Sequence, residues 1–361
     1  MYVSSLSLNN FRNYEKQSVE LFEGTNVFCG RNAQGKTNIL EAIYMFCRGK
    51  STRARQDSEL IRFGEDFFRI EMGFYSNERD FKGIITANKL GKKAIKINNV
   101  PIIKMSMLMS YFNAVFFTPE DLSLIKGSPA QRRRFIDASL CQIYPSYLSS
   151  LVSYNKTLLQ KNFLLKSMRK KGVYSDPTLD VWNEALAKEG ARVSEYRMNF
   201  IESINTLASN IQSDISGEKL SIMYQPGIGC DIDEESYYNY LTVHIKREVD
   251  NGSAQYGIQR DDINIFINDN IARQYSSQGQ QRTAALALKI AQGDYIKELK
   301  NEYPVYLLDD IMSELDINRR RYLWEKIKGK QVIITCTDTD EIETPQNSRL
   351  FYVESGTVKG V

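Results

Sequence analysis

The segment Tyr275-Ser276-Ser277-Gln278-Gly279-Gln280-Gln281-Arg282-Thr283 stands shortly before the acidic stretch Tyr306-Leu307-Leu308-Asp309-Asp310. The helix-forming run Thr283-Ala284-Ala285-Leu286-Ala287-Leu288-Lys289-Ile290 continues from it. The N-terminus of a helix favours anions, so the Ser277 hydroxyl and the Gly279 N–H are candidate donors to a phosphate. A plain polar turn has a similar composition, and the order of the neighbouring motifs favours the phosphate contact.

A phosphate-binding loop stands near the N-terminus of the chain. The residues Gly30-Arg31-Asn32-Ala33-Gln34-Gly35-Lys36-Thr37 fit the pattern G-x-x-x-x-G-K-[ST] at every fixed position. Its glycines let backbone N–H groups close around phosphate oxygens, Lys36 reaches the β and γ phosphates, and the Thr37 hydroxyl is a ligand for Mg²⁺. A β-prone run, 25–29, precedes the loop, and a helical run that starts at Asn38 follows it. The sequence therefore predicts that residues 30–38 bind ATP.

A second element of such a site is a buried strand that ends in carboxylates, and Val305-Tyr306-Leu307-Leu308-Asp309-Asp310 fits this description. We expect Asp309 to hold Mg²⁺ and Asp310 to orient the water that attacks the γ phosphate, with Lys36 as the third catalytic residue. A pair of Asp residues is also typical of a solvated turn. The apolar run before the pair and Ser313-Glu314-Leu315-Asp316 after it favour the nucleotide site.

Most of the chain separates the two elements, which predicts a large insertion in one nucleotide-binding fold. We expect residues 1–118 and 283–361 to form an ATPase lobe, and residues 119–282 to form an inserted, mainly helical lobe that carries Ser277 to Gln280. Apolar residues near heptad spacing predict two long helices, about 146–215, that form a short arm. An ordinary hairpin packed on the lobe is the open alternative. Residues 216–275 are predicted as strands and turns.

The order of these motifs resembles that of the ATP-binding-cassette (ABC) ATPases. The resemblance implies an α/β fold, in which an ABC-type P-loop ATPase lobe with a mixed sheet and helices is interrupted by a helical insertion. In that family, the residues that correspond to Ser277, Gln278, Gly279 and Gln280 cap the γ phosphate held by a second subunit. The resemblance therefore implies an ATP-dependent homodimer with ATP and Mg²⁺ between the protomers, which hydrolysis loosens.

Within this class the chain most resembles the RecF family, nearly from end to end. The stretches that carry the resemblance are Leu8-Asn9-Asn10-Phe11-Arg12-Asn13-Tyr14, Gly30 to Asn38, Phe117-Thr118-Pro119-Glu120-Asp121-Leu122, Lys126-Gly127-Ser128-Pro129, Arg132-Arg133-Arg134-Phe135-Ile136-Asp137, Arg260-Asp261-Asp262, Ser277 to Thr283, and Leu308 to Asp310 with Ser313 to Asp316. So many motifs in one order make the family resemblance specific.

The resemblance implies a bacterial, cytoplasmic, nucleoid-associated ATPase of recombinational repair, replication restart and the SOS response. Its ATP-driven dimer would clamp duplex DNA near gaps and junctions, and would help RecR and RecO to load RecA. Slow, DNA-stimulated hydrolysis would then release the DNA. Two alternatives stay open: an ATPase subunit that drives a membrane partner, and a structural clamp head in which hydrolysis is incidental.

Three departures from the expected patterns bear on the site. Ile258 and Gln259 stand where Pro and His are expected. Asp310 stands where cassette transporters usually have Glu, as it does in RecF, and its shorter side chain suits slow turnover. The run 332–338 lacks the switch histidine, so we expect either Thr335 or Thr337 to contact the γ phosphate, and the sequence does not choose between them.

Composition limits the other functions that the chain could perform. The net charge is only +3, so DNA would have to be bound by local basic clusters such as 132–134, 169–171 or 319–321, each of which is more often a solvated face. No run of about eighteen apolar residues predicts a membrane span. Five scattered cysteines favour a reducing compartment, and the single histidine, His244, argues against a zinc site.

Overall fold

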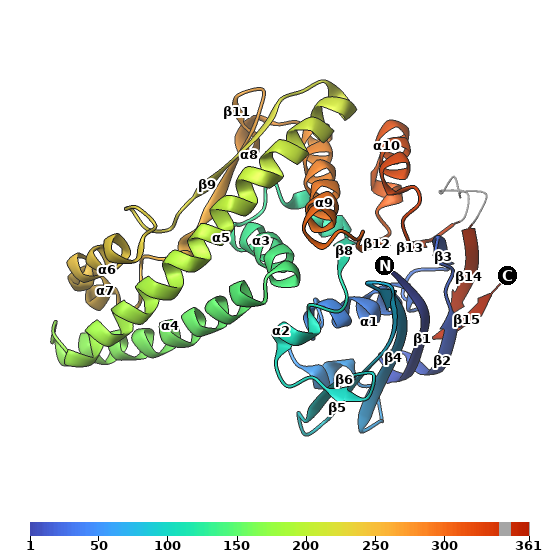
Figure 1. The fold of residues 1–361 in the computed structure, drawn as a ribbon, viewed down its shortest axis with the longest axis horizontal. Coiled ribbons are helices and arrows are strands. Elements are labelled where there is room, and N and C mark those ends of the chain that lie inside the picture. The colour runs from blue at the N-terminus through green and yellow to red at the C-terminus, as the bar shows by residue number, and fades with distance from the viewer. Residues whose placement is uncertain (339–347, 361) are drawn as a thin grey trace. The chain divides into compact units, whose positions relative to one another are not determined.

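The computed structural model describes residues 1–338 and 348–360 (Figure 1). The chain divides into two compact units. The first contains Met1–Ser123, Asn210–Gly217 and Ser277–Val361, and the second contains Leu124–Ser209 and Glu218–Ser276. The chain thus leaves the first unit and returns to it, as the separation of the two nucleotide-site motifs predicts.

The first unit contains an antiparallel sheet of six strands in the order β2-β1-β4-β5-β6-β7. Buried side chains alternate with more exposed ones along β4, which is the pattern of a sheet with one face on a core. Asn77 and Glu78, with φ of 48° and 60°, form the two-residue turn between β4 and β5. The strands are β1 (Tyr2–Phe11), β2 (Tyr14–Glu20), β4 (Phe67–Ser76), β5 (Arg79–Asn88), β6 (Lys93–Ile97) and β7 (Val100–Pro101).

The second sheet of this unit has the order β15-β14-β3-β13-β12-β8, and all its pairings are parallel except that of β15 with β14. Every residue of β3, β12 and β13 is buried, as expected for parallel strands covered on both faces. The strands are β3 (Thr25–Cys29), β8 (Ala114–Phe117), β12 (Val305–Asp309), β13 (Val332–Cys336), β14 (Ser348–Glu354) and β15 (Thr357–Gly360). Because β13 lies between β3 and β12, the carboxyl ends of both predicted motif strands meet at one edge.

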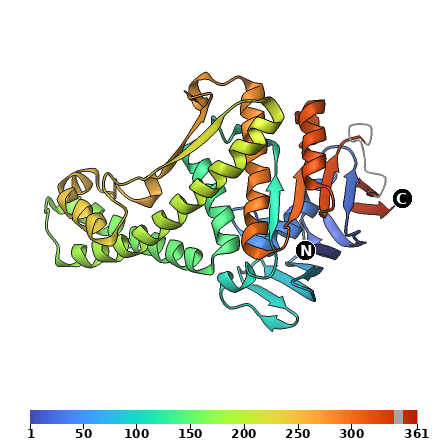
Figure 2. The same cartoon turned by 45° about the horizontal axis from the view of Figure 1, so that its top comes forward.

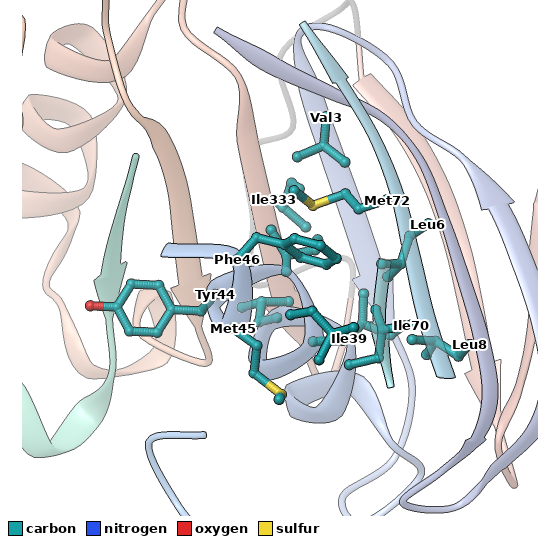
Figure 3. Close-up of a cluster of buried hydrophobic side chains, with 14 of the residues drawn as sticks. Val3, Leu6, Leu8, Ile39, Tyr44, Met45, Phe46, Ile70, Met72 and Ile333 are labelled. Carbon is teal, nitrogen blue, oxygen red and sulfur yellow. The ribbon is translucent and has the colours of Figure 1, made fainter. Parts of the chain in front are cut away.

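Helix α1 (Lys36–Arg48) is the centre of the hydrophobic core of the first unit. Figure 3 shows its Ile39, Met45 and Phe46 among side chains from β1 and β4 and Ile333 of β13. These helix residues are at most 1% exposed. The helix begins directly after the glycine-rich loop, so its burial fixes the position of that loop.

The other helices of the first unit are short, apart from α9, which is buried along most of its length. They are α2 (Met105–Leu108), α9 (Gln278–Lys300) and α10 (Ile317–Ile327), with the 3-10 turns η1 (Asp57–Leu60), η2 (Pro119–Ser123) and η4 (Met312–Glu314).

The second unit is built on two long helices that are joined in a hairpin and diverge from its tip (Figures 1 and 2). They are α4 (Pro145–Lys171) and α5 (Pro177–Ser216), and α4 ends at Gly172 with φ of 67°. Leu165 and Met168 of α4 pack with Val249 of α7, so the hairpin is partly covered by its own unit. The remaining elements are α3 (Pro129–Ile143), α6 (Glu234–Val243), α7 (Ile245–Asn251), η3 (Ile258–Arg260), α8 (Ala272–Tyr275) and an antiparallel sheet of β9 (Leu220–Gln225), β10 (Asp262–Ile267) and β11 (Asn270–Ile271).

Helices α6 and α7 correct the expectation that residues 216–275 contain only strands and turns. The Asp233 side chain accepts a hydrogen bond from Ser236 N at 2.9 Å and caps α6, whose Tyr237 and Leu241 are buried one turn apart. Both helices are short and rich in polar residues, so their apolar positions are too few to show a period.

The boundaries of the units also differ from the predicted limits at 118 and 282. Residues 119–123 belong to the first unit, where Asp121 forms a 3.3 Å ion pair with Lys289. Residues 210–217, at the end of α5, also belong to the first unit. Asp214 in this segment accepts a hydrogen bond from the Tyr322 hydroxyl at 2.9 Å. Ser277 to Gln280 lie in the first unit rather than in the inserted one, because they begin α9.

Candidate nucleotide-binding site

Gly30 and Gly35 are required by the shape of the loop that joins β3 to α1. Gly35 has φ of 118°, and a Cβ there would lie 2.7 Å from the Asn13 side chain and 2.8 Å from the Tyr14 hydroxyl. A Cβ on Gly30 would lie 2.3 Å from the Val353 carbonyl oxygen. Both glycines predicted from the motif therefore permit close approach of other parts of the chain to the loop.

The loop is held from outside by residues of the sequence motif near the N-terminus. Asn13 Nδ2 donates to the Gln34 carbonyl at 2.7 Å, and Asn38 Nδ2 donates to Asn13 Oδ1 at 2.9 Å. The Tyr14 hydroxyl donates to the Gly35 carbonyl at 3.1 Å. Sequence reasoning gave Asn13 and Tyr14 no role, because it could not show that β1 and β2 reach the loop.

Lys36 and Thr37 form the first turn of α1. Lys36 is 4% exposed, and its Nζ donates to the carbonyls of Gly30 and Arg31, which lie in the same loop. The ammonium group thus lies inside the curve of the loop, where a phosphate would be bound. The loop N–H groups and the start of the helix favour an anion at the same place.

Asp309, at the end of β12, contacts Thr37 directly. Its Oδ1 accepts hydrogen bonds from Thr37 Oγ1 at 2.9 Å and from Thr335 Oγ1 at 2.8 Å. Burial raises the pKa of the Asp309 carboxyl above its ordinary value, and the two hydroxyl donors oppose this shift. The structure therefore brings together the two residues that the sequence proposes as Mg²⁺ ligands.

Thr335 and Thr337, between which the sequence could not choose, have different surroundings. Thr335 pairs in register with Asp309 and is fully buried, and its hydroxyl also accepts from Asp310 N at 2.9 Å. Thr337 is exposed. The Thr335 hydroxyl is therefore committed to positioning both carboxylate residues.

Asp310 has a left-handed backbone conformation, with φ of 48°. Residues other than glycine rarely adopt it, and strain of this kind is often found at functional sites. Asp310 also lines an open pocket of about 1030 Å³ together with residues 32, 33 and 35–38 of the loop. The residue predicted to orient water thus faces the same cavity as the phosphate-binding loop.

Other residues line this pocket without having been predicted. They are Arg12, Asn13, Arg53, Glu59, Ile61, Arg62 and Phe63. Arg12 is fixed by two hydrogen bonds of 3.0 Å to the buried Glu41 carboxylate. Arg62 also forms an ion pair, at 3.2 Å with Glu15, so Arg53 and Lys36 are the lining cations best placed to meet a polyphosphate. The resemblance includes Arg12 in one of its motifs, Arg53 had only a nearby basic residue, Arg55, as a signal, and Arg62 had none.

The chemistry of the site fits ATP with Mg²⁺. Mg²⁺ prefers oxygen ligands and is commonly held by one or two protein oxygens together with phosphate oxygens and water. The Thr37 hydroxyl and the Asp309 carboxylate supply such oxygens within hydrogen-bonding distance of each other. A cation here would also offset the cost of the buried carboxylate.

Ser277, Gln278, Gly279 and Gln280 do not line this pocket. Ser277 is the N-cap of α9: its Oγ accepts from Gln280 N at 3.2 Å, and its own N–H donates to Gln280 Oε1 at 2.8 Å. This reciprocal capping box starts the helix at Gln278, rather than at Thr283 as predicted. The segment therefore forms a helix N-terminus that is not part of the pocket lining of its own chain.

Two of the predicted basic clusters are largely used inside their own units. Arg132 is 3% exposed and binds the Asp262 carboxylate with Nε at 2.7 Å and Nη2 at 2.8 Å. Arg133 donates to the Asp261 carbonyl at 2.6 Å. Arg319 donates to the Gly279 carbonyl at 2.9 Å and to Thr283 Oγ1 at 2.8 Å. These arginines stabilise the fold.

Comparison with known proteins agrees with this geometry. Residues 2–359 match the RecF/RecN/SMC N terminal domain family. The DNA replication and repair protein RecF of Agathobacter rectalis is 42% identical over 363 residues, which cover 99% of this chain and 99% of that protein. The chain belongs to the RecF family. The RecF protein of Clostridium perfringens is 40% identical and covers 99% of this chain and 100% of its own length.

Solved structures of RecF have the same fold. The recombination mediator protein RecF-ATPrS in the RecFOR pathway superposes with a TM-score of 0.94 at 36% identity, over 100% of this chain and 98% of that one. An Smc head bound to the C-winged helix domain of ScpA superposes with a TM-score of 0.58 at 19% identity, over 100% of this chain and 97% of that one. The predicted fold, an ABC-type P-loop ATPase lobe with an insertion, is confirmed. Within residues 1–338 and 348–360, no helix has the length and apolar character needed to cross a membrane.

Proposed function

We propose that this RecF-family protein is an ATP-gated, DNA-binding dimer of recombinational repair and replication restart. The observation that carries the proposal is the 2.9 Å contact between Thr37 and Asp309 beside a phosphate loop whose pocket is lined by Asp310. This arrangement suits a bound nucleoside triphosphate with its metal ion. A RecF structure with ATP, 36% identical over 100% of this chain, has a TM-score of 0.91.

In this proposal each residue of the site has a defined task. The loop from Gly30 to Asn38 holds the triphosphate, and Lys36 leaves its carbonyl partners to bind the β and γ phosphates. Thr37 and Asp309 hold Mg²⁺, which neutralises phosphate charge. Asp310 orients the attacking water, while the N–H contact to Thr335 keeps its backbone in place.

The dimer follows from the place of Ser277 to Gln280. They lie at the N-terminus of α9 and outside the pocket of their own chain, which supports a contact with the γ phosphate of a second protomer. ATP then joins two protomers, and its hydrolysis removes the shared ligand. Closure of the dimer brings the DNA-binding surfaces of the two protomers together on duplex DNA near a gap or junction. Slow, DNA-stimulated hydrolysis of ATP then releases the DNA.

The partners in this proposal come from the RecFOR pathway, in which the similar solved protein acts. The dimer marks the DNA site for RecR, with RecO, and these proteins then load RecA. Such a protein works on the chromosome in the bacterial cytoplasm. Contacts to DNA are made mainly with phosphates and therefore weaken steeply as salt is raised.

The test is fluorescence anisotropy of a labelled gapped duplex with Mg·ATP. Wild type should bind DNA with ATP and release it as ATP is consumed. Lys36→Ala should not bind ATP and should show no ATP-dependent binding to DNA. Asp310→Asn should bind both, hydrolyse ATP about 10²–10⁴-fold more slowly, and stay on DNA. Release by Asp310→Asn at the wild-type rate would refute the role of Asp310, and DNA binding that ignores ATP would refute the switch.

A further inference from the structure

Helix α4 has an exposed face that its own unit does not use. Its buried residues, among them Tyr154, Lys161 and Leu165, fix the helix in the second unit. On the opposite side, Val152, Leu159 and Phe163 are 58%, 69% and 77% exposed. Large apolar side chains gathered on one face commonly mark an interaction site, whereas isolated ones do not.

The exposed residues follow a heptad seam. Val152, Lys156, Leu159, Phe163, Lys166 and Lys170 are spaced alternately by four and three residues, so they lie in one narrow stripe along the helix. We call these six residues the α4 stripe. This is the spacing with which one helix packs along another, and α4 forms an edge of the second unit in both views (Figures 1 and 2).

The charge of the stripe is of one sign. Lys156, Lys166 and Lys170 are all exposed, and the sequence of α4 contains no Asp or Glu. The lysine that lies on the buried side, Lys161, is paired with Glu248 at 2.6 Å. The stripe thus offers apolar contacts over its first part and positive charge toward its C-terminal end.

A second copy of this chain is a poor occupant of the stripe. In an antiparallel pair centred between Leu159 and Phe163, Lys156 would face Lys166 of the other copy. In a parallel pair in register, each lysine would face itself. Like charges at such positions are unfavourable. DNA would use the lysines but would leave Leu159 and Phe163 without apolar partners.

We propose that the α4 stripe docks a helix of a partner protein that carries apolar residues opposite Val152, Leu159 and Phe163, and carboxylates opposite the lysines. The inference rests on the proposed function, because the partners to be tested are the other proteins of the RecFOR pathway. It adds to that function a surface in the second unit, separate from the residues that hold nucleotide.

The experiment measures binding of purified RecR and RecO, from the same organism, to immobilised full-length protein. Each of two stripe variants is compared with a matched control. Phe163→Ser is compared with Val181→Ser, which changes an exposed valine of α5. Lys170→Glu is compared with Lys171→Glu, which changes an exposed neighbouring lysine that lies off the stripe. Each stripe variant should weaken the binding of RecR or RecO by about tenfold or more, and each control should leave it unchanged.

ATP affinity and binding to a gapped duplex are measured on the same samples. The stripe variants should keep both at the wild-type level, which also shows that they are folded. Loss of DNA binding with intact protein binding would identify the stripe as a DNA surface and overturn the proposal. Equal effects of variants and controls, or wild type that binds neither RecR nor RecO, would also overturn it. Wild type that fails to bind DNA with ATP would instead refute the proposed function.

Discussion

At the scale of single residues, Thr335 shows how the fold sets the chemistry of the site. Its hydroxyl donates to Asp309 Oδ1 and accepts from Asp310 N, so one buried side chain positions both carboxylate residues. The left-handed backbone of Asp310 depends on such support, because its conformation is unfavourable for a residue with a Cβ.

We predict that Thr335→Val lowers the free energy of unfolding by about 1–3 kcal/mol, because the buried Asp309 carboxylate then loses a donor and the half-buried Asp310 N loses its acceptor. Valine has nearly the same shape, so packing is kept. The variant should also show weaker dependence of ATP affinity on Mg²⁺. Thermal unfolding and ATP titration with and without Mg²⁺ measure both effects. Thr337→Val is the exposed control, and an equally large effect of this substitution would contradict the account.

The sequence predicted the loop, Asp309 and Asp310, because their positions are fixed by a short motif and by an apolar strand. Which of Thr335 and Thr337 contacts the γ phosphate stays a prediction. The sequence could not show that Thr335 supports Asp309 and Asp310, because this depends on the register of β13 with β12. Asn13 and Tyr14 were missed for a similar reason, since only tertiary structure brings them to the loop.

At the scale of elements, the start of α9 contains a glycine that the helix itself does not need. Gly279 is helical, and a Cβ there would meet only Arg319 Nη2 at 3.3 Å and Ser277 Oγ at 3.8 Å. Glycine within a helix costs up to about 1 kcal/mol relative to alanine. A close approach of phosphate to this backbone gives the glycine a function.

Gly279→Ala should therefore change the stability of the monomer by no more than about 1 kcal/mol, because the gain in helix propensity is offset by the tight contact with Arg319, and should weaken ATP-dependent dimerisation. Chemical denaturation measures the first effect and sedimentation velocity the second. Ala284→Gly, a buried substitution in the same helix, is the control for helix stability and should destabilise the monomer. A Gly279→Ala dimer as tight as wild type would argue against contact at this glycine.

The elements also show what a sequence pattern can and cannot reveal. Ser277 and Gln280 have the spacing of a capping box, yet the segment was interpreted as a turn before a helix at Thr283. Strands β3 and β12 were predicted at their observed positions, because β3 is a β-prone run directly before the phosphate loop and β12 is an apolar run that ends in a carboxylate. The polar helices α6 and α7 lacked such a signal.

At the scale of the whole molecule, the second unit depends on buried charge. Lys161 of α4 and Glu248 of α7 form a 2.6 Å ion pair, and both side chains are fully buried. Burial lowers the pKa of Lys161, and the Glu248 charge opposes that shift. Such a pair joins helices that are far apart in the sequence, and no local pattern predicts it.

Lys161→Met should destabilise the protein by about 3–5 kcal/mol, because it leaves Glu248 charged and buried without its partner. The double variant Lys161→Met with Glu248→Leu should recover most of this loss, because it removes both charges. Urea denaturation of the full chain measures both changes. A double variant no more stable than Lys161→Met would show that the pair is not the cause.

The proposed dimer requires that Ser277 to Gln280 complete the ATP site of a second protomer. Ser277→Asp separates this role from helix capping, because Asp is also a good N-cap but repels a phosphate. Sedimentation velocity of wild type and Ser277→Asp, with Mg·ATP and a gapped duplex, is the most direct test, with thermal unfolding as the check on capping. Wild type should form a DNA-bound dimer, and Ser277→Asp should be a folded, ATP-binding monomer. A Ser277→Asp dimer as tight as wild type, or wild type that stays monomeric with ATP and DNA, would contradict the proposed dimer.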